Sequence, residues 1–87
     1  MDERIQGQRV RCYDNGGKTF DRFTVVYMDE PDSRGLFAAV GMSDNPFHAQ
    51  GIGQHNSAQP GRHLGRRIPF YKLPEDCKKL VYRDLGL

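Results

Sequence analysis

The stretch from Gly41 to Gly65 (GMSDNPFHAQGIGQHNSAQPGRHLG) most limits what this chain can fold into, because it offers almost no aliphatic side chains to a core. It holds five of the ten glycines and all three histidines of an 87-residue chain. A chain of this length is one domain and buries only about 60–65% of the surface that it exposes when unfolded. We therefore predict a single domain over residues 1–87, whose core comes from the segments on either side of this stretch.

Four short segments have the pattern of β-strands. Residues 9–13 and 20–28 are rich in strand-forming side chains, and the Asp-Asn-Gly-Gly sequence between them predicts a hairpin turn. Residues 36–42 predict a third, more buried strand after a polar turn. Residues 66–71 predict a short fourth strand, and Pro69 confines it to a sheet edge because proline lacks the amide hydrogen.

The C-terminal segment predicts the one helix. Pro74 followed by two carboxylates is typical of a helix start, and Gly86 is typical of a stop. Between them the apolar residues recur at helical spacing: Cys77, Leu80, Val81 and Leu85. The predicted fold is α+β, with a small antiparallel sheet of three to four strands, a long Gly/His-rich loop and this C-terminal helix across one face.

The predicted long loop, which begins at about Ser43, is the first candidate for a functional surface. Loops longer than about 12–15 residues are uncommon in compact domains, and they are usually functional or disordered. We expect Phe47, Ile52 and Leu64 to pin this loop to the core, so that its polar side chains take fixed positions. The residues predicted to bind a ligand or partner, from this loop and the basic edge after it, are His48, Gln50, Gln54, His55, Asn56, Arg62, His63, Arg66 and Arg67.

The positive charge gathers in the last third of the chain. The formal net charge of +2 is too small to imply nucleic-acid binding by itself. Residues 62–87, however, hold seven basic and three acidic residues, which makes a basic face suited to a phosphate-bearing ligand or an acidic partner. On a strand, Arg66 and Arg67 point to opposite faces, so we do not expect them to form a compact phosphate clamp.

The chain lacks the spacing of the common chemical motifs. Its three histidines are separated by seven and eight residues, without the HExxH or paired CxxC pattern of zinc sites, so we predict no metal. Residues 14–19 (DNGGKT) end like a phosphate-binding loop but lack its first glycine, and residues 51–55 (GIGQH) lack the GxGxxG spacing. We therefore predict no cofactor and no catalytic residue.

Cysteine use and hydropathy predict a cytoplasmic protein. Cys12 and Cys77 lie far apart and outside any CxxC motif, which favours reduced thiols over a disulfide. The first ten residues lack the apolar core of a signal peptide, and no run approaches the ~20 apolar residues of a membrane span. We expect a soluble protein that has no membrane contact.

Three blocks of the chain resemble a group of known proteins. The blocks are YDNGGKTFDRFTVVY (residues 13–27), VGMSDNPFHAQGIGQH (40–55) and HLGRRIPFYKLPEDCKKLVYRDL (63–85). They resemble small uncharacterised accessory proteins encoded by bacteriophages, prophages and mobile elements. The resemblance carries over no catalytic or binding residue. It implies an accessory protein in the bacterial cytoplasm that binds a host component, including host defence machinery.

The leading hypothesis is a non-catalytic binding module that engages a host protein or a small phosphate-bearing ligand through residues 41–67. One alternative is a small enzyme in which His48 or His55 transfers a proton to or from a phosphate ester that Arg62 holds. Zinc-supported folding and nucleic-acid binding are two further alternatives. The oligomeric state is open, and a homodimer through an exposed sheet edge is compatible with this fold.

Overall fold

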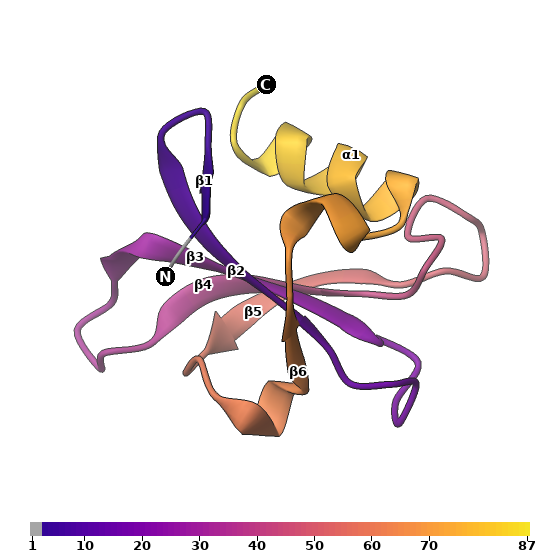
Figure 1. Ribbon diagram of the computed structural model, residues 1–87, viewed down its shortest axis with the longest axis horizontal. Coiled ribbons are helices and arrows are strands. Elements are labelled where there is room, and N and C mark those ends of the chain that lie inside the picture. Colours follow the sequence, from indigo (N-terminus) through magenta and orange to yellow (C-terminus); the bar gives the residue numbers. More distant parts are fainter. Residues whose placement is uncertain (1–2) are drawn as a thin grey trace.

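The structure, a computed structural model, describes residues 3–87 apart from the side chain of Glu30. Within this range the chain forms a six-stranded antiparallel sheet, two short 3-10 helices and one α-helix (Figure 1). The elements are β1 (Glu3–Ile5), β2 (Gln8–Asp14), β3 (Phe23–Pro31), β4 (Phe37–Met42), β5 (Gly53–Ala58), η1 (Arg62–Leu64), β6 (Arg66–Ile68), η2 (Phe70–Lys72) and α1 (Glu75–Asp84).

The sheet is a meander that returns to its first long strand. Strands β1 to β5 lie side by side in chain order, and each pairs antiparallel with the next. Strand β6 then pairs with the second half of β2, on the edge where β1 pairs with the first half. The end of the chain is thereby brought back beside its beginning, with η1 just before the returning strand (Figure 1).

The structure confirms the α+β class, the antiparallel sheet and the C-terminal helix, but the sheet has more strands than predicted. The prediction of one long loop is wrong, because residues 53–58 form β5 and pair with β4 over its whole length. Strand β5 (GQHNSA) has no apolar alternation and is almost fully exposed. Backbone hydrogen bonds hold it in place, and no side-chain pattern reports those bonds.

The other unpredicted strand, β1, forms a hairpin with β2. Its two-residue turn places Gln6 and Gly7 at φ angles of 54° and 83°, the left-handed region that such tight hairpins require. The carboxylate of Glu3 accepts a hydrogen bond from the Phe70 amide at 2.7 Å, which ties this hairpin to η2. The predicted strand at residues 66–71 is shorter than expected, since its second half becomes η2.

Apolar residues fill both faces of the twisted sheet. The larger cluster lies between the sheet and α1, and the predicted helix residues Cys77, Leu80 and Val81 are all buried in it. The smaller cluster lies on the opposite face, where it is built from Tyr13, Val26, Met28 and Ala39 with Leu64 of η1 packed against them. Helix α1 and η1 therefore cover opposite faces of one sheet (Figure 1).

The shortened loop, residues 43–52, is closed by Ser43. Its amide donates to the Ile52 carbonyl and its Oγ accepts from the Ile52 amide, both at 2.9 Å. The Ser43 carbonyl also accepts a hydrogen bond from the Cys77 thiol at 3.1 Å, which links the loop to α1. A serine that is 1% exposed thus orders the loop through hydrogen bonds.

The three apolar residues that were predicted to hold this region on the core differ in their burial. Phe47 is not an anchor in the core, because it is 47% exposed and its ring lies 5.3 Å from the Arg83 guanidinium. Leu64 packs against the smaller apolar cluster, as expected of a pin, and Ile52 is half-buried. The loop is ordered by the hydrogen bonds of Ser43 with Ile52, and not by the predicted burial of Phe47. A hydrophobicity pattern does not indicate such hydrogen bonds.

Candidate functional site

A hollow on the sheet face opposite α1 gathers arginines from three elements. Arg11 comes from β2, Arg62 from η1, and Arg66 and Arg67 from β6, around a space of about 570 Å³. Tyr13 forms part of its wall, because Arg11 and Tyr13 alternate along β2 with the residues that face α1. We call this site, defined by these five residues, the arginine hollow.

Close packing fixes part of the arginine hollow. The Arg67 guanidinium lies 5.8 Å from the centre of the Tyr13 ring, within the range of a cation–π contact. Tyr13 itself is only 3% exposed and belongs to the smaller apolar cluster. Arg67 is thereby held on a rigid support, which lowers the conformational entropy that a bound anion would have to remove from it.

A neighbouring carboxylate is already engaged by an arginine outside the arginine hollow. Asp14 pairs across the sheet with Arg66, and it accepts hydrogen bonds from Arg22 Nε at 2.7 Å and from an Arg22 terminal nitrogen at 3.0 Å. The bond from Arg22 is the main cause that lowers the pKa of Asp14, although partial burial opposes it. Asp14 thus stays ionised and remains occupied by Arg22 at neutral pH.

Arg66 and Arg67 are neighbours on β6. Their alternation is as predicted, since Arg66 pairs with Asp14 and Arg67 pairs with Tyr13. Both side chains nevertheless line the arginine hollow. That they form no compact phosphate clamp stays a prediction.

Gly65 sets the position of this edge. It has a φ of 116°, and a Cβ placed on it would lie 2.4 Å from the carbonyl oxygen of Asp14. Its amide donates to the Arg62 carbonyl at 3.0 Å, which closes η1 immediately before β6. Only glycine lets the chain pass this close to the end of β2, and that approach brings Arg62 and Arg66 beside Arg11.

The remaining predicted site residues lie elsewhere. His48 and Gln50 are exposed in the loop, where His48 Nδ1 accepts a hydrogen bond from the Gln50 amide at 3.1 Å. The others are exposed on β5 or η1, and none of them lines the arginine hollow: Gln54, His55, Asn56 and His63. The structure therefore brings together the three predicted arginines and places His48 and His55 away from them, whereas His63 follows Arg62 in η1.

Sequence reasoning missed Arg11 and Tyr13 as members of the site. The alternation of Arg11 and Tyr13 with Val10 and Cys12 was the available signal, because it places the first pair on one face of β2. Nothing in the local sequence indicated that η1 would pack beside that face. Arg11 and Tyr13 meet the arginines of η1 and β6 because β6 pairs with β2.

His55 has a structural partner on α1. Its Nε2 lies 2.8 Å from Asp84 Oδ2, and the Tyr27 hydroxyl donates to the same oxygen at 2.5 Å. Burial is the main cause that raises the pKa of Tyr27, and the bond to Asp84 adds to it. Three elements, β3, β5 and α1, are joined at this carboxylate.

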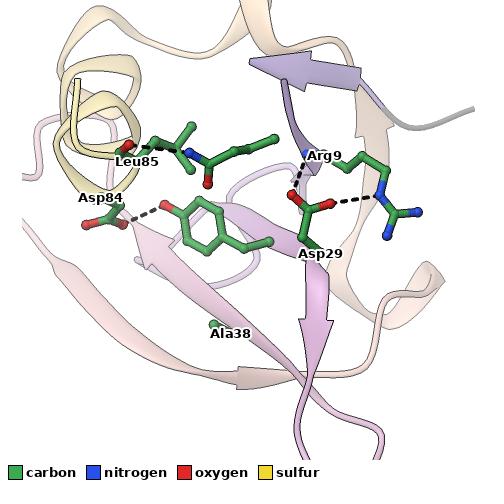
Figure 2. Close-up of a pocket in the computed structure, with 7 residues that line it drawn as sticks. Arg9, Asp29, Ala38, Asp84 and Leu85 are labelled. Carbon is green, nitrogen blue, oxygen red and sulfur yellow. Dashed lines mark hydrogen bonds and ion pairs between the residues drawn. The ribbon is translucent and has the colours of Figure 1, made fainter. Parts of the chain in front are cut away.

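Figure 2 shows a second hollow, which lies beside that carboxylate and has a volume of about 480 Å³. Its polar groups bind one another: Arg9 Nε donates to Asp29 at 2.9 Å, and the Gln8 side chain donates to the Leu85 carbonyl at 3.4 Å. These contacts connect the end of α1 to β2 and β3. Because these polar groups bind one another, we interpret their contacts as structural and assign no function to this hollow.

The phosphate-loop-like residues do not present their amides to a ligand. The Gly16 amide donates to Asp14 Oδ1 at 2.8 Å, and the Gly17 and Lys18 amides donate to Asn15 Oδ1 at 2.8 and 3.0 Å. A phosphate cradle needs such amides to point at the anion. The side chains of Asp14 and Asn15 use them instead to stabilise the turn.

Among residues 3–87, no three His, Cys, Asp or Glu side chains lie together as a metal site requires. No helix in the same range is both long enough and apolar enough to cross a membrane. Cys12 and Cys77 are both buried as free thiols in the larger apolar cluster.

These thiols should be unreactive while the protein is folded. Burial is the main cause that raises the pKa of Cys12 and of Cys77 to about 12, and the thiolate is the reactive form. We expect Ellman's reagent at mildly alkaline pH to label both thiols rapidly in denaturant and neither rapidly without it. A fast reaction of one thiol in the native protein would contradict the burial described here.

Comparison with known proteins identifies no relative, since no protein-family model, curated protein or solved structure matches the chain. The resemblance to bacteriophage accessory proteins therefore stays a prediction.

Proposed function

We propose that this chain is a non-catalytic binding module that recognises an anionic group of its partner through the arginine hollow. The observation that carries the proposal is that four arginines, from β2, η1 and β6, line one hollow. Arginine side chains grouped in this way attract an anion from several sides.

Arginine is well suited to this role. Its planar guanidinium presents several donors that match the oxygens of phosphate and carboxylate, and it keeps its charge at every physiological pH. The contact with Tyr13 holds Arg67 in place before the ligand arrives, and the tight turn at Gly65 sets the backbone position of η1 and β6. In the bacteriophage setting that the resemblance implies, the anion would belong to a component of the host cell.

The alternative of a histidine-dependent enzyme has less support from this arrangement. That mechanism requires His48 or His55 to act on an ester held by Arg62. Arg62 lines the arginine hollow, whereas His48 lies in the loop at residues 43–52 and His55 binds Asp84 of α1. Binding without catalysis is the function that these positions favour.

The test is the affinity for inorganic pyrophosphate, measured by calorimetry on the native chain and on two double variants. Arg62→Gln with Arg66→Gln removes two charges from the arginine hollow and leaves the Arg67 contact with Tyr13 in place. We expect this variant to bind about tenfold more weakly or worse, because each charge-assisted hydrogen bond contributes about 1.5–3 kcal/mol.

Lys72→Gln with Lys79→Gln is the matched control. It removes the same charge from exposed positions on η2 and α1, so the affinity should stay within about twofold of the native value. Thermal melts of both variants would show that they are folded. Equal affinities for the two variants, or no saturable binding by the native chain, would overturn the proposal.

A further inference from the structure

The arginine hollow continues into a longer basic groove. It shares Arg62, Gly65 and Arg66 with an adjacent hollow that extends along the turn after β2. That hollow shares Lys18 and Arg22 with a third one, which ends at Phe20 and Asp44. We call these three connected hollows the basic groove.

Positive charge is present along the whole basic groove. Its cationic side chains are Arg11, Lys18, Arg22, Arg62, Arg66 and Arg67. Its two carboxylates are Asp14, which Arg22 already binds, and Asp44 at the far end. Because Arg22 is paired with Asp14, Lys18 is the cation that the third hollow offers to a ligand. One small anion would fill one hollow only, whereas a chain of anionic groups would contact both the arginine hollow and Lys18.

An aromatic side chain stands at the end of the basic groove opposite the arginine hollow. Phe20 is 60% exposed and lines the third hollow beside Lys18. An exposed phenylalanine leaves its apolar surface in water, and a partner that covers the ring gains the free energy of burying that surface. A basic track that follows a backbone and an aromatic ring on which a base stacks are the two components of single-strand recognition.

We propose that the basic groove binds a single-stranded nucleic acid, with phosphates in the arginine hollow and a base stacked on Phe20. This proposal rests on the proposed function, since it assigns the arginine hollow to the phosphates. A concave groove suits a flexible strand, while a duplex is read by an element that protrudes into its major groove. An acidic peptide would supply the charges but has no base to stack on Phe20.

The first measurement is the affinity for fluorescently labelled oligothymidylate of about eight nucleotides. We expect it to bind at least about tenfold more tightly than a labelled thymidine dinucleotide, because the longer strand reaches from the arginine hollow to Phe20. Raising the salt concentration should weaken the binding steeply, and less steeply in the Arg62→Gln, Arg66→Gln variant.

The second measurement isolates Phe20. Phe20→Ala should weaken oligothymidylate binding about tenfold, as expected for one lost base stack, and leave pyrophosphate affinity unchanged. Phe47→Ala is the matched control, because Phe47 is also exposed but contacts Arg83 of α1 and does not line the basic groove. This control should bind the oligonucleotide like the native chain.

The outcomes separate this proposal from the one on which it rests. If pyrophosphate binding depends on Arg62 and Arg66 but oligothymidylate binds no tighter than the dinucleotide, the nucleic-acid proposal is wrong and anion binding stands. The same holds if a polyglutamate peptide binds as tightly as the oligonucleotide, which would identify an acidic protein as the partner. If neither pyrophosphate nor oligothymidylate binds, both proposals fail.

Discussion

Replacing Gly65 with alanine should lower the free energy of unfolding by about 2–5 kcal/mol. Two costs add at this position: a left-handed φ of 116°, and a methyl group 2.4 Å from the Asp14 carbonyl oxygen. Backbone on both sides prevents easy relief, because β6 pairs with β2 at this point. Urea denaturation would measure the loss, and the melting temperature should fall by at least about 8 °C.

Gly16→Ala is the control for Gly65→Ala. Gly16 also has a positive φ, 78°, but no atom lies within 4 Å of the position that its Cβ would take. Its substitution should therefore cost only the conformational strain, about 1 kcal/mol. Equal losses in the two variants would show that the close approach to Asp14 contributes nothing. The Gly65 variant should also bind pyrophosphate more weakly while still folded, because η1 must shift.

Truncating Leu80 to alanine should cost about 2–5 kcal/mol of stability, the range for large-to-small changes in a core. Leu80 is 2% exposed and lies in the larger apolar cluster between α1 and the sheet. Its Cδ1 lies so near β5 that a Cβ on Gly53 would be only 2.8 Å from it. The cavity would thus open where α1 meets both the core and the polar strand β5.

Lys79→Ala is the control for this substitution. It changes an exposed residue of the same helix and should alter stability by no more than about 0.5 kcal/mol. Under conditions where the Leu80 variant is folded, its pyrophosphate affinity should match the native value, because the arginine hollow lies on the other sheet face. A loss below about 1 kcal/mol would mean that α1 is only loosely packed on the sheet.

The elements that could be predicted are those whose apolar residues repeat with a local period. Strands β2, β3 and β4 are close to their predicted ranges, and α1 buries Cys77, Leu80 and Val81 as its spacing indicated. Each of these elements contributes side chains to the larger apolar cluster. A segment that must bury one face shows this requirement in its own sequence.

Strand β5 could not be predicted in this way. Its six residues are polar or small, and the register with β4, such as Val40 opposite His55, is fixed by backbone hydrogen bonds. The turn that leads to it is closed by Ser43, one residue among many polar ones in the loop. These determinants are contacts with β4 and α1, which lie outside the segment itself.

The candidate site divides in the same manner. Two of its features can be read from the sequence: Arg62, Arg66 and Arg67 follow a glycine-rich stretch, and Arg11 and Tyr13 share a strand face. That these two groups meet depends on the folded chain, because β6 pairs with β2 and Gly65 permits the close approach. Local periodicity reports which side chains need burial, whereas contact between distant segments depends on backbone pairing that no side-chain pattern records.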